Sequence, residues 1–519
     1  MATLDAPRPE GRFSRWGLKK NADEIIAEAR DPSRSLKKNL GWLDLTVLGI
    51  GAIIGTGIFV LAGVGAARAG SGIILSVAFA GLVCAFVGLC YAELASTIPT
   101  SGSAYGYTYA TLGELVAWVL GWALVLEYAV GSVAVAIGWS SYAQGLLGQM
   151  GIALPAAIAA SPLSGVPGAV INLPAVLIVL AITSILLVGV KESARVTSGL
   201  VAIKLFIIVF VIAVGFFFLN PTNITNNPIP ATSLSTGQPI SPVSAVMAGA
   251  AIFFFAYIGF DAVSTTAEET RNPKRDLPIG ILLSLGITTV LYILAAVVLV
   301  GMTGWEVYAD PTHPHHAAAL SEPFGYAFDA AGLPWAAAII RAGAIAGITS
   351  VLMVLLLGAP RIFFALARDG LFPERLAAVH PTRGTPFKTT MLTGGAVALA
   401  AGFLDLGRAA EMTNIGTLFA FALVCIGVVV LRRSRPDLER PFKVPFSPWF
   451  PILGAVGSIY LAYNLDRFTH FAFFAWMGIG VIIYALYGVH KSSLFRRGAG
   501  ARNVAVGARE TEVVVEEMR

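Results

Sequence analysis

Long apolar runs separated by short polar segments dominate the chain. Each run holds about twenty residues, which as a helix is long enough to cross about 30 Å of hydrocarbon. Twelve such spans are predicted, at residues 42–67, 72–97, 116–146, 172–190, 198–219, 243–268, 279–301, 335–366, 387–405, 409–431, 449–466 and 469–490. The pattern predicts an all-α polytopic membrane protein with twelve transmembrane helices.

Composition excludes other classes. Of the 519 residues, 56% are hydrophobic and only 13% are charged, which excludes a water-soluble globular protein. The three cysteines, Cys84, Cys90 and Cys425, all lie inside apolar runs, so they form neither a disulfide framework nor a metal-ligand pattern. The net charge of +5 does not indicate a nucleic-acid partner, because the basic residues gather in loops on one side of the predicted membrane.

The basic residues predict the orientation. Six segments hold 28 of the 35 Lys and Arg residues: 1–41, 191–197, 270–278, 367–386, 432–448 and 491–519. Three long loops on the other side hold none: 147–171, 220–242 and 302–334. Loops rich in Lys and Arg stay on the cytoplasmic side of a membrane. We therefore expect a plasma (inner) membrane protein with both termini in the cytoplasm.

The spans divide into two matching groups. Residues 42–219 hold helices 1 to 5 and residues 243–431 hold helices 6 to 10, and an odd number of spans per half makes the second half inverted. Helices 11 and 12 follow at 449–490. The cytoplasmic segments 1–41 and 491–519 lie outside the membrane, and 21–31 is predicted to form a short amphipathic helix.

Two spans contain residues that favour interruption of the helix. Span 1 has four glycines within nine residues, Gly49, Gly51, Gly55 and Gly57. In span 6, Gly259 is followed by Asp261. Each glycine costs about 1 kcal/mol in a helix interior relative to alanine, so we expect helices 1 and 6 to unwind there. Paired interruptions in inverted halves indicate a transporter binding site, although small residues also allow close helix packing.

The two interruptions offer complementary chemistry. The restart of helix 1 presents backbone amides and a positive dipole end to an anion, at Gly55, Thr56 and Gly57. The break in span 6 leaves carbonyls free for an ammonium group, at Phe255, Ala256, Tyr257 and Ile258. An anion site beside a cation site fits the α-carboxylate and α-amine of a free amino acid.

Ionisable residues inside spans are candidates for function. Burial disfavours the charged form of Lys204, so this lysine either exchanges a proton during transport or acts as a charged strut on the carbonyls of the broken helix. Asp261 either caps the restarted helix 6 or contributes a polar group to the core. Glu127 either holds a polar group in the core or contacts substrate, and Arg341 is expected to snorkel outward from span 8.

Four motifs carry a family resemblance. They read GIGAIIGTGIFVLAG, YAELASTIPTSGSAYGYTYATLGEL, FFAYIGFDAVSTTAEETRNPKRDLP and APRIFFALARDGLFP. With them, residues 42–490 resemble bacterial members of the cationic amino acid transporter family, within the amino acid/polyamine/organocation superfamily. The resemblance implies a leucine-transporter-like fold, a five-plus-five inverted repeat with helices 1 and 6 unwound and two further C-terminal helices.

The resemblance also implies site residues. Carboxylate binding maps to Gly55, Thr56 and Gly57, and amine binding to Phe255, Ala256 and Ile258, with Phe255 as an aromatic gate. Lys204 matches the lysine that replaces a sodium ion in proton-coupled relatives, and Thr349 matches a contact to the substrate side chain. Because span 8 lacks an acidic residue near Thr349, a cationic substrate does not follow from the resemblance.

We therefore expect proton-coupled secondary active transport of L-amino acids by alternating access, with protons as coupling ion and no cofactor. The substrates expected are arginine, lysine, ornithine or small neutral amino acids, and a small accessory subunit in the membrane is left open. The alternative is a proton-independent exchanger or facilitator of amino acids or polyamines. An enzyme is disfavoured because no P-loop, H-E-x-x-H or nucleophile elbow occurs, a channel because no selectivity filter occurs, and a receptor because no signalling domain is present.

Overall fold

The computed structural model describes residues 38–100, 102–188, 194–225, 229–230, 239–373 and 387–492. The first half contains α2 (Trp42–Ile53), η2 (Gly57–Leu61), α3 (Ala62–Ala69), η3 (Gly70–Gly72), α4 (Ile73–Thr97), α5 (Ser103–Thr111), α6 (Glu114–Gln149), α7 (Ala156–Ala159), α8 (Leu173–Val188), α9 (Ala194–Gly215), η4 (Phe216–Phe218) and α10 (Pro221–Thr225). The rest contains α11 (Pro242–Phe253), η5 (Phe254–Tyr257), η6 (Phe260–Glu269), α12 (Pro273–Thr303), α13 (Glu306–Ala309), α14 (His316–Ser321), α15 (Pro323–Ala330), α16 (Pro334–Arg368), α17 (Phe387–Phe403), α18 (Leu406–Ser434), α19 (Trp449–Tyr463), α20 (Arg467–Ile483), η7 (Tyr484–Gly488) and α21 (Val489–Lys491).

A helix occurs at each predicted span, with bounds within a few residues of those expected. Among the described residues, eight helical stretches are long and apolar enough to cross a membrane, and α2, α8 and α19 are shorter apolar helices. In the part of the chain that the structure describes, the all-helical membrane architecture is therefore confirmed. The count of twelve crossings and the inverted repeat stay predictions, and the helix expected at 21–31 lies outside the described residues.

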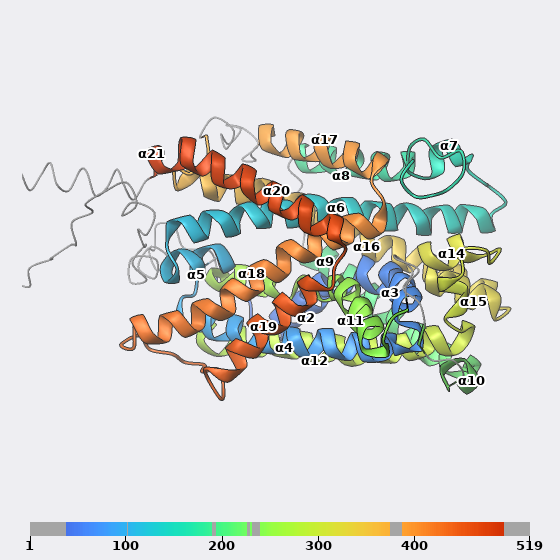
Figure 1. Cartoon of the computed structure of the whole chain (residues 1–519), viewed down its shortest axis with the longest axis horizontal. Helices are drawn as coiled ribbons and strands as arrows, with labels where there is room; N and C mark the ends of the chain where they lie inside the picture. The colour runs from blue at the N-terminus through green and yellow to red at the C-terminus, as the bar shows by residue number, and fades with distance from the viewer. Residues whose placement is uncertain are drawn as a thin grey trace, which may run out of the picture.

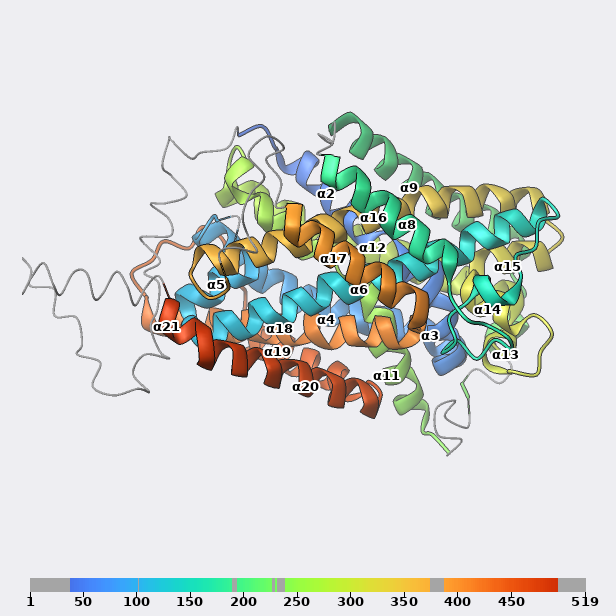
Figure 2. The same ribbon diagram turned by 90° about the horizontal axis from the view of Figure 1, so that it is seen from above.

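The helices form an elongated bundle whose long axis most of them follow (Figure 1). In both views α5 and α21 lie at one end, here called the α5 end, and α14 and α15 lie at the other, the α15 end (Figure 2). Helix α6 runs along the bundle and packs against α16 and α18, while α4 packs on α12 and α8 on α17. Helices α4 and α12 both also contact the interrupted helices, including η6.

Tryptophan side chains fasten α20 to α6. The rings of Trp122 and Trp476 stack with centroids 4.5 Å apart. Each indole also donates to the other residue's backbone carbonyl, with N–O distances of 2.9 and 3.0 Å. Trp118 adds a third indole bond, to the Gly480 carbonyl at 2.9 Å. Because every indole N–H is paired, these aromatic residues attach α20 without leaving buried donors unsatisfied.

Arg341 does not snorkel outward, contrary to expectation. Its side chain is buried and forms ion pairs with Glu322 at 2.6 Å and Asp329 at 2.7 Å. Both carboxylates come from the segment of α14 and α15 that folds over the α15 end of the bundle. A guanidinium group stays buried where carboxylates pair with its forked donors, so this segment is pinned to α16.

Backbone hydrogen bonds tie the start of α2 to the end of η6. The amides of Asn39 and Leu40 donate to the Glu269 carbonyl at 3.0 and 3.1 Å, and the Arg271 amide donates to the Leu40 carbonyl at 2.9 Å. Leu40 and Thr270 thereby form an isolated parallel bridge. The first and sixth helices are thus joined at the α5 end through backbone atoms.

Gly259 occupies a position that other residues tolerate poorly. Its φ is +120°, and a Cβ built there would lie 2.7 Å from the Ala52 carbonyl oxygen. We expect Gly259→Ala to cost about 1–3 kcal/mol through backbone strain and overlap, and to lower the thermal unfolding midpoint in detergent. Gly286→Ala is the matched control, because nothing lies within 4 Å of that helical glycine. Equal midpoints for the two variants would contradict the prediction.

Candidate functional site

Helix 1 is interrupted where the glycines predicted it. Helix α2 ends at Ile53, Ile54 is extended with φ −72° and ψ 110°, and a π-helical turn begins at Gly57. The first amides of a restarted helix have no acceptor within that helix. Gly55, Thr56 and Gly57 lie at this restart, and the Thr56 hydroxyl is buried without a partner among the described residues. This is the amide-rich, dipole-positive place expected for an anion.

Two side chains from other helices satisfy carbonyls at the end of α2. Lys204 of α9, 1% exposed, donates from Nζ to the Gly51 carbonyl at 2.6 Å. Tyr292 of α12 donates its hydroxyl to the Ile53 carbonyl at 3.0 Å. The last carbonyls of a helix lack partners within it. These two hydrogen bonds therefore lower the free-energy cost of interrupting the helix inside a bilayer. The Lys204 bond is the contact expected of a strut.

Helix 6 is interrupted in the matching place. Helix α11 ends at Phe253, a 3₁₀ turn follows over η5, Ile258 is extended, and η6 continues as a 3₁₀ helix from Phe260. The Ile258 amide donates to the Phe255 carbonyl at 3.2 Å. The expectation that the Phe255 carbonyl is free was therefore wrong in this conformation, because the tight turn uses it. The Phe255 side chain is 7% exposed.

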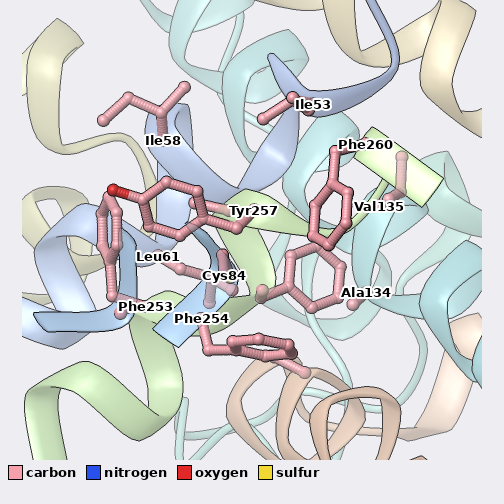
Figure 3. Close-up of a cluster of buried hydrophobic side chains, with 14 of the residues drawn as sticks. Ile53, Ile58, Leu61, Cys84, Ala134, Val135, Phe253, Phe254, Tyr257 and Phe260 are labelled. Atoms are coloured by element: carbon pink, nitrogen blue, oxygen red, sulfur yellow. The ribbon is translucent and has the colours of Figure 1, made fainter. Parts of the chain in front are cut away.

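The two interruptions face each other. A Cβ on Gly57 would overlap the Cα of Ala256, so the backbones of η2 and η5 touch there. Gly259 and Ala52 make the second close approach, described above. Figure 3 shows Ile53 and Ile58, from the two sides of the first break, in the same buried cluster as Tyr257 and Phe260 of helix 6. The structure thus brings together the residues predicted to bind the carboxylate of a substrate and those predicted to bind its amine.

Helices α6 and α16 form a wall beside the first break. A Cβ on Gly138 would lie 2.6 Å from the Thr56 methyl group, and a Cβ on Gly55 would lie 2.8 Å from Val351. The Trp139 indole donates to the Thr349 hydroxyl at 2.9 Å. Thr349, predicted to contact a substrate side chain, is therefore already paired with an aromatic residue. The side chains named in this wall carry no charge.

Two buried carboxylates, Glu127 and Asp261, lie near each other in the core. Glu127 is 2% exposed, lies within hydrogen-bonding reach of Thr417, and has an Oε2 without a partner among the described residues. Asp261 is close enough to interact electrostatically with it. Asp261 lies in the first turn of η6, whose N-cap is Gly259, so it does not occupy the cap position itself. A carboxylate in the first turn still interacts favourably with the positive N-terminal end of the helix dipole.

Three residues of this region were not found from the sequence: Trp139, Tyr292 and Asn414. In the sequence the two aromatic residues cannot be told from other apolar residues of the spans. Only the structure shows which groups the Trp139 indole N–H and the Tyr292 hydroxyl contact. Asn414 is a polar residue inside a span, and the rule that selected Glu127 and Lys204 would also have selected it. Among the described residues no cluster suited to a metal ion occurs.

Comparison with known proteins now identifies the family. A family model described as amino acid permease matches residues 40–483. The chain is 44% identical over 480 residues to the branched-chain amino acid permease BcaP of Bacillus subtilis (strain 168), covering 92% of this chain and 98% of the relative. It is 43% identical to the methylthioribose transporter of the same organism, covering 92% and 99%.

A plant relative supports the resemblance seen in the motifs. The chain is 38% identical over 421 residues to the vacuolar cationic amino acid transporter 4 of Arabidopsis thaliana, covering 81% of this chain and 67% of the relative. The relatives named here are permeases and transporters, so the prediction that the chain is not an enzyme is confirmed. The chain belongs to the amino acid permease family of the amino acid/polyamine/organocation superfamily.

Proposed function

We propose that this chain moves L-amino acids across the plasma membrane by alternating access, in symport with protons. The observation that carries the proposal is the apposition of two interrupted helices, which sets first-turn amides at Gly55–Gly57 against the turn at Ala256–Ile258. Unwound backbone in a bilayer lines a cavity or packs on protein, and in transporters it binds substrate. The amides hold the α-carboxylate, and the carbonyls of the helix 6 break hold the α-amine.

The architecture proposed is the five-plus-five inverted repeat with two further helices. Three of the extensive packings support it, because α4 with α12, α6 with α16, and α8 with α17 each join predicted spans that are five apart. The Lys and Arg distribution supports an orientation with the α5 end in the cytoplasm. Helices 1 to 5 then fall within 42–219 and helices 6 to 10 within 243–431, as predicted.

For the substrate, the wall beside the first break favours a neutral side chain. Trp139, Thr349 and Val351 carry no charge there. A cationic side chain buried in a membrane protein needs a counter-charge or water. The relative of 44% identity is named for branched-chain amino acids, whereas the plant relatives are named for cationic ones. We therefore place small and branched neutral amino acids ahead of arginine, lysine and ornithine.

Lys204 is the proposed site of proton coupling. It is buried, contacts the Gly51 carbonyl, and has no carboxylate in a salt bridge among the described residues. Gain and loss of a proton there changes the bond that holds the end of α2, which links protonation to the shape of the substrate site. The same bond also suits a permanent strut, so a proton-independent amino acid or polyamine exchanger is the second candidate.

Purified protein in proteoliposomes should take up labelled amino acids with saturation, and an imposed gradient with acid outside should raise the initial rate and cause accumulation. Each of the twenty amino acids is first ranked by thermal shift of the purified protein. Uptake that ignores the pH gradient removes the proton part of the proposal. Binding of polyamines alone would move the chain to another branch of the superfamily.

Lys204→Ala should abolish accumulation driven by a pH gradient, because the titratable group is gone. The initial rate of concentrative uptake is the measurement, with at least about a tenfold fall expected, as for loss of an essential acid–base group. Lys274→Ala is the control, since that exposed lysine pairs only with exposed Glu439 in the described contacts. Wild-type accumulation by Lys204→Ala would show that the lysine is a structural strut.

A further inference from the structure

The backbone carbonyls at the end of α11 lie where the helix geometry changes, and the Phe254 amide donates to those of Ala250 and Ile252. At Phe253 the chain changes from α-helical to 3₁₀ geometry and then becomes extended at Ile258. Such a change displaces the amides that would bond the last α-helical carbonyls. In a bilayer a carbonyl that loses its amide partner in this way needs another partner from the protein.

Asn414 of α18 supplies that partner. Its Nδ2 donates to the Ala251 carbonyl at 2.8 Å and to the Ile252 carbonyl at 3.1 Å. The residue is 0% exposed, and its Oδ1 has no hydrogen-bond partner among the described residues. A buried amide with one unpaired oxygen is less favourable than an apolar side chain of the same size. Packing alone therefore does not account for asparagine at this position.

Lys204 makes the corresponding bond in the other half of the chain. Its target, Gly51, is two residues before the end of α2, and Ala251 is two residues before the end of α11. Lys204 belongs to the fifth predicted span and Asn414 to the tenth. In each proposed repeat, the fifth helix thus donates to the final carbonyls of the half-helix that precedes the interruption.

We propose that Asn414 is the second-repeat counterpart of Lys204, a positioning residue that holds the helix 6 break in the shape that binds the substrate's α-ammonium group. This inference rests on the proposed function. The two counterparts differ in chemistry, because an ammonium group can release a proton whereas an amide donates hydrogen bonds without titrating. The hydrogen bond at the helix 1 interruption can therefore change with protonation, whereas the hydrogen bonds from Asn414 at the helix 6 interruption cannot.

The test compares ligands modified at one end. Affinities are measured by competition against labelled substrate for the best amino acid, its N-methyl derivative and its methyl ester. Asn414→Leu removes the donor at nearly constant volume. It should weaken binding of the amino acid about tenfold, the scale of one or two lost hydrogen bonds, with little change in maximal rate. Discrimination against the N-methyl derivative should fall, and discrimination against the ester should stay.

Asn464→Leu is the matched control. Asn464 also donates its amide to a backbone carbonyl, that of Tyr460 at 2.8 Å, but near the surface at the end of α19. It should leave all three affinities unchanged. Where Asn414→Leu yields no folded protein, Asn414→Ala carries the same comparison without added bulk.

The outcomes separate the two proposals. Unchanged amino acid affinity in Asn414→Leu, or an equal loss for all three ligands, overturns the role of Asn414, since a general structural effect does not distinguish the amine from the carboxylate. Wild-type protein that binds no amino acid, or that accepts both modified ligands as well as the parent, overturns the proposed function instead.

Discussion

The structure depends on how broken backbone is satisfied inside a bilayer. A continuous helix pairs its own amides and carbonyls, and an interruption leaves several of them without partners where no water is available. Here Lys204 and Tyr292 serve the end of α2, and Asn414 serves the end of α11. The backbone groups at the restart of helix 1 and around Ala256 in helix 6 are the ones that we propose bind the substrate.

The supporting residues come from the elements that surround the broken helices. Helix α9 supplies the lysine, α12 the tyrosine and α18 the asparagine, while α6 and α16 supply the uncharged wall with Trp139 and Thr349. Preorganisation of this kind lowers the cost of ordering a site when ligand binds. Each of these helices therefore contacts the backbone or the side chains beside the two interruptions, where we propose that the substrate binds.

Much of this was predictable because its causes are local. The lengths of the apolar runs predicted where the helices lie. The glycines at 55, 57 and 259 predicted the positions of both interruptions to within a residue or two. Arg341 was misjudged because its partners, Glu322 and Asp329, reach it only after α14 and α15 fold back over the bundle. The Phe255 carbonyl was misjudged because a 3₁₀ turn, rather than open chain, follows α11. A single sequence does not show which hydrogen-bond partners the tertiary structure brings to each polar group.

The bridge between Leu40 and Thr270 adds a mechanical consequence. Its three hydrogen bonds use only main-chain atoms, and they join the two half-helices that approach each other again at Ala52 and Gly259. A hydrogen-bonded bridge at one place and a close backbone contact at another restrict rotation of one half-helix against the other. Because the linkage uses backbone atoms, we expect it to persist when the side chains of Asn39 and Leu40 are changed.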